Sequence, residues 1–221
     1  MIAIDLPYHG NTIWQENREF THVDLMDILE QIMRERNIKE RNFSIIGYSL
    51  GGRIALSLLE NNGGRISRIV LLAPDGIKVN SWYWLATQTH IGTRLFRFTM
   101  KKPAWFLHSL QFADRFKIVN KSVTKFTKAY IGDATARMEL LNRWICMRSF
   151  KPDLKKVHDI ILQKKISVKI LYGKHDRIIL PKRSEDFREG LNGLCEVVLL
   201  DEGHQLLQKK YAAVIASMLT V

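Results

Sequence analysis

The chain has 221 residues, of which 46% are apolar and 25% charged, the composition of an ordinary globular domain. The formal charge of +12 comes entirely from the segment between Lys78 and Lys165, which holds 18 basic and 5 acidic residues. No nucleic-acid recognition motif accompanies these charges, so we expect no nucleic-acid partner. The two cysteines, Cys146 and Cys195, have no metal-ligand spacing, which argues against a structural zinc site and favours a reducing, cytoplasmic setting.

The first 74 residues alternate short apolar runs with segments of helical periodicity. We predict strands at residues 2–5, 43–47 and 68–73, and helices at residues 22–36 and after residue 49. Short apolar strands separated by helices are typical of a parallel sheet that helices cover on both faces. The first ten residues lack a basic stretch followed by a long apolar run, so neither a signal peptide nor a membrane span is predicted.

Residues 75–151 have a different pattern. Apolar residues recur there every three or four positions, and the segment holds 13 of the 21 aromatic residues. We predict a helical insertion, or cap, with an apolar inner surface. Its basic residues are either simply solvated, or they form a face that docks on an anionic membrane or binds an anionic substrate.

Residues 152–221 return to the alternation of strands and helices. Strands are predicted at residues 168–173 and 196–200, with helices at residues 182–191 and from about residue 205. The sequence therefore predicts an α/β core formed by residues 1–74 and 152–221, with residues 75–151 as the cap.

The pentapeptide Gly47-Tyr48-Ser49-Leu50-Gly51 matches the G-x-S-x-G nucleophile elbow. It lies between a predicted strand and a predicted helix, where a strained turn exposes the serine at the carboxyl end of the sheet. Bulky side chains in place of Gly47 and Gly51 are expected to collide with the neighbouring strand and helix. The N-terminus of the following helix and the Leu50 N–H would then stabilise an oxyanion.

Two later loops supply the other side chains that such a serine needs. Asp176 follows the strand at residues 168–173, and His204 follows the strand at residues 196–200, each at the carboxyl end of its strand. Asp75, after the strand at residues 68–73, is the rival for the acid. The other six histidines lack the position that His204 has, preceded by glycine and following the final strand.

With these three loops in view, the sequence resembles the α/β-hydrolase superfamily, in its cap-bearing branch of esterases, lipases and C–C hydrolase-like enzymes. The segment "IAIDLPYHGNT" is similar to the family's D-x-P-G-H-G segment, with Tyr8 where glycine is usual. "GYSLGG" matches the elbow, "LYGKHDRIILP" resembles the acid loop, and "EGHQLL" resembles the histidine loop.

The resemblance implies a role for each residue of the site. Ser49 would be the nucleophile, His204 the general base and then acid, and Asp176 the carboxylate that orients the imidazole. Leu50 would donate its N–H to the oxyanion, and Tyr48 would lie beside it at the oxyanion and substrate site. No metal and no organic cofactor are implied.

One part of the family pattern has no counterpart here. The family domain begins with three strands before the one at residues 2–5, and an oxyanion loop that usually contains His-Gly follows the third. Either Met1 is an internal start of a longer protein, which we favour, or the strands at residues 2–5 and 43–47 pair directly and Leu50 is the sole assignable oxyanion donor.

The expected function is hydrolysis of a carboxylic ester of a hydrophobic acyl or aromatic small molecule through an acyl-enzyme. Two alternatives remain open. The absent oxyanion segment favours a non-catalytic α/β-hydrolase-like binding protein, and the basic aromatic cap favours a lysophospholipase-like hydrolase that works at an anionic lipid surface.

Overall fold

A computed structural model of the chain describes residues 1–116, 131–191 and 193–219. The chain forms two compact units. One comprises Met1–Phe20 and Asn80–Ser149, and the other comprises Thr21–Val79 and Phe150–Val221. They are called the helical unit and the sheet unit below, and each is described by itself.

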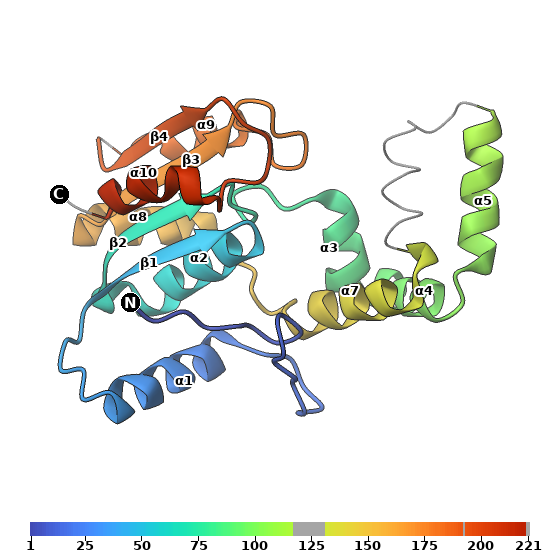
Figure 1. Cartoon of the computed structure of the whole chain (residues 1–221), viewed down its shortest axis with the longest axis horizontal. Helices are drawn as coiled ribbons and strands as arrows, with labels where there is room; N and C mark the ends of the chain where they lie inside the picture. Colours follow the sequence, from blue (N-terminus) through green and yellow to red (C-terminus); the bar gives the residue numbers. More distant parts are fainter. Residues whose placement is uncertain (117–130, 192, 220–221) are drawn as a thin grey trace. The chain divides into compact units, whose positions relative to one another are not determined.

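The sheet unit alternates strands and helices along the chain (Figure 1). Its elements are α1 (His22–Glu35), β1 (Phe43–Tyr48), α2 (Leu50–Asn62), η1 (Gly63–Arg65), β2 (Ile66–Leu72), α8 (Leu154–Lys164), β3 (Ser167–Gly173), α9 (Arg183–Arg188), β4 (Cys195–Leu200), η2 (Lys209–Tyr211) and α10 (Ala212–Ser217).

The four strands form one parallel sheet in the order β1-β2-β3-β4. In this register Tyr48 lies beside Leu72, and Gly173 lies beside Leu200, so the carboxyl ends of the strands meet at one edge. β2 and β3 are the central strands, and most of their side chains are buried. The predicted strands at residues 43–47, 68–73, 168–173 and 196–200 are confirmed to within two residues at their ends.

Helix α1 begins where its sequence signal predicts. The Thr21 hydroxyl accepts a hydrogen bond from the Asp24 N–H, and the Asp24 carboxylate accepts one from the Thr21 N–H, which is a capping box. Leu25 and Met33 are buried on its inner face. Helix α2 packs on β1 and β2, and α8 packs on α2.

Two predictions in the outer parts of the chain are wrong. Residues 2–5 form no strand; the chain turns directly afterwards, with hydrogen bonds from the Tyr8 N–H to the Thr12 carbonyl and from the His9 N–H to the Leu6 carbonyl. The last helix begins only at Ala212, because residues 201–208 form the loop that carries His204 and buries Leu206.

The helical unit contains α3 (Ser81–Gln88), α4 (His90–Lys101), α5 (Ala104–Arg115) and α7 (Ala134–Cys146), so the predicted helical character of this segment is confirmed for its described part. A small core of its own is centred on Met100, Ile131 and Leu141. Residues 117–130 of the predicted cap lie outside the described residues.

The units also group the first twenty residues differently from the predicted division, which assigned residues 1–74 to the core. Here Met1–Phe20 groups with the helices. The Arg143 guanidinium donates to the Tyr8 carbonyl at 2.6 Å, and the Phe20 N–H donates to the Cys146 carbonyl at 2.9 Å. These bonds join the opening segment to α7 and its C-terminal end.

Candidate active site

Ser49 lies in the turn between β1 and α2 with φ 50° and ψ −114°, a conformation that L-residues rarely adopt. Three backbone hydrogen bonds hold it there. Its N–H donates to the Leu72 carbonyl at 2.9 Å, and its carbonyl accepts from the N–H groups of Gly52 and Asp75, each also at 2.9 Å. Because its neighbours over-determine this strained backbone, the side chain is held at the carboxyl edge of the sheet.

Glycines allow the close packing around this turn, although not all of those expected. A Cβ on Gly47 would lie 2.4 Å from the Gly51 carbonyl oxygen, and one on Gly52 would lie 2.6 Å from the Pro74 side chain. A Cβ on Gly51 would meet nothing within 4 Å, so the collision predicted at that position is wrong. The close approach instead joins Gly52, one residue later, to the loop that follows β2.

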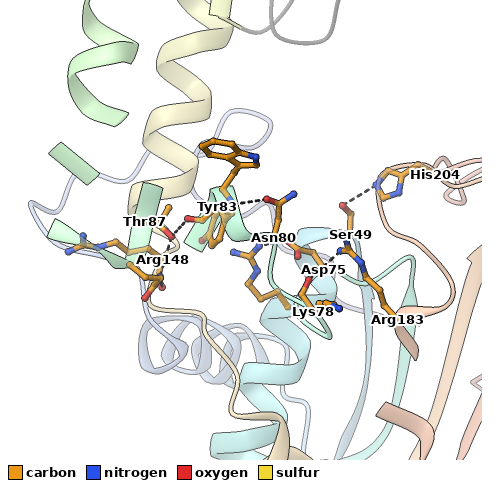
Figure 2. A network of polar contacts seen from close by, with 12 residues as sticks. Ser49, Asp75, Lys78, Asn80, Tyr83, Thr87, Arg148, Arg183 and His204 are labelled. Atoms are coloured by element: carbon orange, nitrogen blue, oxygen red, sulfur yellow. Dashed lines mark hydrogen bonds and ion pairs between the residues drawn. The ribbon is translucent and has the colours of Figure 1, made fainter. Parts of the chain in front are cut away.

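His204 links Ser49 to Asp176. Its Nε2 lies 3.1 Å from the Ser49 Oγ, and its Nδ1 lies 2.7 Å from the Asp176 Oδ2 (Figure 2 shows the imidazole directed at the serine). A carboxylate can only accept a hydrogen bond, so Nδ1 carries the proton and Nε2 is left to accept the proton of the serine hydroxyl. The structure thus brings together the three residues predicted as nucleophile, base and acid.

The Asp176 carboxylate is saturated with hydrogen bonds. Its Oδ1 accepts from the N–H groups of Ile178 and Ile179 at 2.8 and 2.9 Å, while Oδ2 faces His204. The side chain has no solvent-exposed surface. These hydrogen bonds therefore take the place of the hydrogen bonds to water that the carboxylate loses on burial. The two backbone donors also fix the orientation of the carboxylate, so that its Oδ2 faces the imidazole.

The acid loop and the histidine loop are joined by backbone contacts. The His175 N–H donates to the Glu202 carbonyl at 2.8 Å, and a Cβ on Gly173 would lie 2.1 Å from the Gly203 carbonyl oxygen. Glycine at position 173 therefore permits the two loops to approach each other.

Asp75, the rival for the acid, is engaged elsewhere. Its carboxylate forms an ion pair with the Arg53 guanidinium of α2, and the Arg53 side chain is 2% exposed. None of the sequence motifs identifies Arg53. The available signal was an arginine in a helix whose other residues from Gly52 to Leu59 are apolar or small. The pair joins α2 to the loop after β2, one helical turn beyond Ser49.

Tyr48 and Leu50 flank Ser49. The Tyr48 hydroxyl lies 3.2 Å from the His204 carbonyl and 3.4 Å from the Gln205 Oε1, so it can donate to either, and its ring centroid lies 5.5 Å from that of His204. Burial and the nearby Asp176 charge raise the Tyr48 pKa, which keeps the hydroxyl protonated as a donor. Tyr48 was predicted to lie at the oxyanion and substrate site. In the structure its hydroxyl contacts the histidine loop.

Leu50 is the first residue of α2, and a backbone N–H at that position has no acceptor within its own helix. It therefore points from the positive end of the helix dipole and is available to a negatively charged oxygen.

An open groove of about 570 Å³ lies elsewhere in the sheet unit, between α8, α9 and the loop after β2. Lys78, Lys155, His158, Arg183 and Phe187 are among its lining residues. Ser49, Asp176 and His204 do not line it, so the groove is distinct from the candidate active site. At one of its walls the Arg183 guanidinium donates to the Lys78 carbonyl at 3.3 Å (Figure 2).

The described residues contain no group of three or more histidine, cysteine or acidic side chains that could hold a metal ion. In the same part of the chain, no helix has both the length and the apolar character needed to cross a bilayer.

Comparison with known proteins gives one family and many structural likenesses. A family model described as the alpha/beta hydrolase fold matches residues 1–210. Among curated proteins, a biotin biosynthesis bifunctional protein from Teredinibacter turnerae is 35% identical over 81 residues. That match covers 37% of this chain and 13% of the curated protein, so the chain spans only a small part of that relative.

Among solved structures, a carboxylesterase of the thaumarchaeon Nitrososphaera gargenis has a TM-score of 0.59 at 16% identity, over 97% of this chain and 77% of its own. An esterase from Thermogutta terrifontis also has a TM-score of 0.59, at 15% identity over 95% and 74%. An esterase from Exiguobacterium antarcticum has a TM-score of 0.52 at 17% identity over 95% and 76%. At such identities the likeness is one of fold.

Proposed function

Since the chain belongs to the alpha/beta hydrolase family, we propose that it is a serine hydrolase that cleaves a carboxylic ester of a hydrophobic acyl or aromatic small molecule. The observation that carries the proposal is the pair of hydrogen-bond distances at His204, 3.1 Å to the Ser49 Oγ and 2.7 Å to the Asp176 Oδ2. A serine, an imidazole and a buried carboxylate in this order form the arrangement that activates a serine hydroxyl.

The proposed reaction has two halves. In the first, His204 Nε2 takes the proton of Ser49 as the serine oxygen attacks the ester carbonyl, and the imidazolium then gives that proton to the departing alcohol. In the second, Nε2 takes a proton from water as the water oxygen attacks the acyl-serine, the bond between the acyl carbon and Oγ breaks, and the imidazolium returns the proton to Oγ as the acid departs. Asp176 holds the imidazole with Nε2 toward the serine and stabilises it while it is charged.

The oxyanion of each half-reaction would accept a hydrogen bond from the Leu50 N–H at the start of α2. One such donor is typically worth about a hundred- to a thousand-fold in rate. No metal ion or organic cofactor enters any step of this reaction.

The aromatic content of the helical unit supports a hydrophobic substrate. Trp144 has ring contacts with Tyr83 and Phe96, at centroid distances of 5.0 and 5.2 Å. The esterase names among the solved structures are consistent with an ester substrate, although those likenesses extend only to the fold.

Labelling with a fluorophosphonate probe tests the proposed nucleophile. The wild-type protein should be labelled at Ser49, as located by mass mapping, and Ser49→Ala should not be labelled. Ser44→Ala is the matched control, because Ser44 lies exposed on β1 and its hydroxyl contacts Ser67. Labelling at another residue, or no labelling of the folded wild type, would contradict the assignment and favour a non-catalytic binding protein.

Ester preference needs a second measurement. Initial rates on p-nitrophenyl acetate, butyrate, octanoate and phenylacetate should rise with the apolar surface of the acyl group, and Ser49→Ala should lose the activity on each ester. Labelled protein that hydrolyses none of these esters would retain the serine assignment and exclude the proposed substrate class.

A further inference from the structure

Helix α4 exposes apolar side chains along one line of its surface. Ile91, Leu95 and Phe98 are 84%, 51% and 49% exposed. Successive residues in an α-helix are about 100° apart, so these three side chains fall within an arc of about 60°. We call them the apolar stripe.

The apolar stripe is separate from the side of α4 that packs into the helical unit. Phe96 and Met100 lie about 100° or more from the stripe and belong to the core around Leu141. Thr93 and Thr99 are also buried. A helix on the surface of a soluble domain ordinarily has one apolar side and a polar opposite side. Helix α4 has its core-facing side and an additional apolar line that the core does not use.

The exposed apolar surface continues onto α5. The rings of Phe98 and Trp105 have centroids 6.5 Å apart, and Trp105 is 41% exposed. Phe112, two turns along α5 from Trp105, is 64% exposed and packs on Phe116 at a centroid distance of 4.6 Å. Large exposed aromatics that adjoin one another mark interaction surfaces rather than the scattered apolar residues of an ordinary surface.

A basic line runs beside the apolar stripe. Arg94, Arg97 and Lys101 are all exposed, and their positions on the helix fall within an arc of about 60° next to the stripe. Helix α4 contains no acidic residue. We call these three residues the basic stripe.

We propose that the apolar and basic stripes of α4 dock the protein on an anionic phospholipid bilayer. A helix that lies in a membrane interface buries its apolar residues about 5–10 Å deep and keeps its basic residues at the headgroups, which requires the two kinds of side chain to lie side by side. That is the arrangement of Ile91, Leu95 and Phe98 beside Arg94 and Arg97.

The positive charge of α4 favours a lipid surface over a second copy of the chain as the partner of this face. A symmetric dimer through this face would bring two basic stripes together, and like charges placed opposite each other disfavour such an association. An anionic bilayer accepts both the apolar side chains and the positive charges. Docking requires no hydrolysis, so the inference does not rest on the proposed function.

Vesicle co-sedimentation of the purified full chain tests the docking. We expect binding to vesicles of 70% phosphatidylcholine and 30% phosphatidylserine, much weaker binding to phosphatidylcholine alone, and weakening as NaCl rises from 0.1 to 0.5 M. Ser49→Ala should bind like the wild type, which separates a failure of docking from a failure of catalysis.

Two pairs of variants isolate the stripes. Arg94→Gln/Arg97→Gln should bind the anionic vesicles about thirtyfold more weakly, at about fivefold for each basic residue near the surface. The control Arg36→Gln/Arg41→Gln removes the same charge from exposed positions outside α4 and should change binding less than twofold. Ile91→Ser should weaken binding about tenfold, whereas Ile13→Ser, at a position 73% exposed, should not.

Circular dichroism should show the wild-type fold in every variant. A loss of vesicle binding is then due to the altered surface of α4 and not to unfolding. Absence of binding to the anionic vesicles would overturn the proposal, as would equal losses in the α4 variants and their controls. A dimer that Ile91→Ser dissociates, together with no vesicle binding, would assign the stripe to a second copy of the chain and would also overturn it.

Discussion

Replacing Asp75 by asparagine should destabilise the protein without disturbing the hydrogen bonds of His204 to Ser49 and Asp176. The Arg53 guanidinium, 2% exposed, would lose its carboxylate partner at the start of α2. Removing one member of a buried ion pair costs about 3–5 kcal/mol, because the remaining charge stays out of water. Asp75 is 19% exposed, so water already reaches part of the pair, and we expect a loss of about 2–4 kcal/mol in the free energy of unfolding.

The same substitution at Asp176 should have a different effect. Asparagine there would favour the wrong tautomer of His204 and should slow fluorophosphonate labelling of Ser49 by about 10⁴-fold, as in other triads whose acid is neutralised. Folded Asp75→Asn protein should be labelled within tenfold of the wild type, because the ion pair of Asp75 does not involve the imidazole.

Urea denaturation followed by far-UV circular dichroism gives the stability of each variant, and labelling in the absence of urea gives the reactivity of Ser49. The double variant Arg53→Met/Asp75→Asn should regain part of the lost stability, because it also removes the buried charge. If Asp75→Asn abolished labelling while Asp176→Asn left it intact, the assignment of the two aspartates would be reversed. A stability loss below 1 kcal/mol in Asp75→Asn would show that Arg53 does not depend on this partner.

Three further outcomes are expected. Tyr48→Phe removes a hydrogen bond to the histidine loop and should slow Ser49 labelling about fivefold, as measured by gel fluorescence, with little change in urea midpoint. Gly47→Ala, whose Cβ would lie 2.4 Å from a carbonyl oxygen, should lower the free energy of unfolding measured in urea by more than about 2 kcal/mol. Gly51→Ala, in the first turn of α2, should raise it by up to about 1 kcal/mol. Burial raises the pKa of the Cys195 thiol to about 11 from its ordinary 9, so the folded state holds this proton more tightly. This proton therefore contributes fully to the free energy of unfolding below pH 9, and the contribution, about 2 kcal/mol or less, is lost as the pH rises from 9 to 11. In Cys195→Ala the urea midpoint should lack this part of the decline with pH.

The elements of the sheet could be predicted because each carries its own local signal. Strands 43–47 and 168–173 are apolar runs bounded by glycine, and the helix at residues 22–36 has a capping residue at Thr21 and regular apolar spacing. Ser49, Asp176 and His204 could be placed together because each follows a strand, and the carboxyl ends of parallel strands meet at one edge. These inferences needed no knowledge of long-range packing.

The remaining features depend on partners that the local sequence does not name. Residues 2–5 have the composition of a strand, but a strand exists only where a neighbouring edge accepts its hydrogen bonds, and in the structure these residues are not part of the sheet. The pairing of Arg53 with Asp75 joins positions 22 residues apart through a loop, and the contact of Tyr48 with His204 joins positions 156 apart. Helical or strand periodicity contains no information about such contacts.

The spread of Ser49, Asp176 and His204 along the chain has a consequence for when the proposed reactivity of Ser49 would appear during folding. Ser49 and His204 are 155 residues apart in sequence, and they follow different strands of the same sheet, Ser49 directly after β1 and His204 in the loop after β4. The Ser49 hydroxyl therefore has no imidazole beside it until β4 has paired with β3 and the loop after β4 has brought His204 to it. Until then it should react like the hydroxyl of an ordinary serine. Fluorophosphonate trapping during refolding would thus measure when the last strand joins the sheet. A ribosome-bound chain that ends before residue 204 should not react with the probe at Ser49.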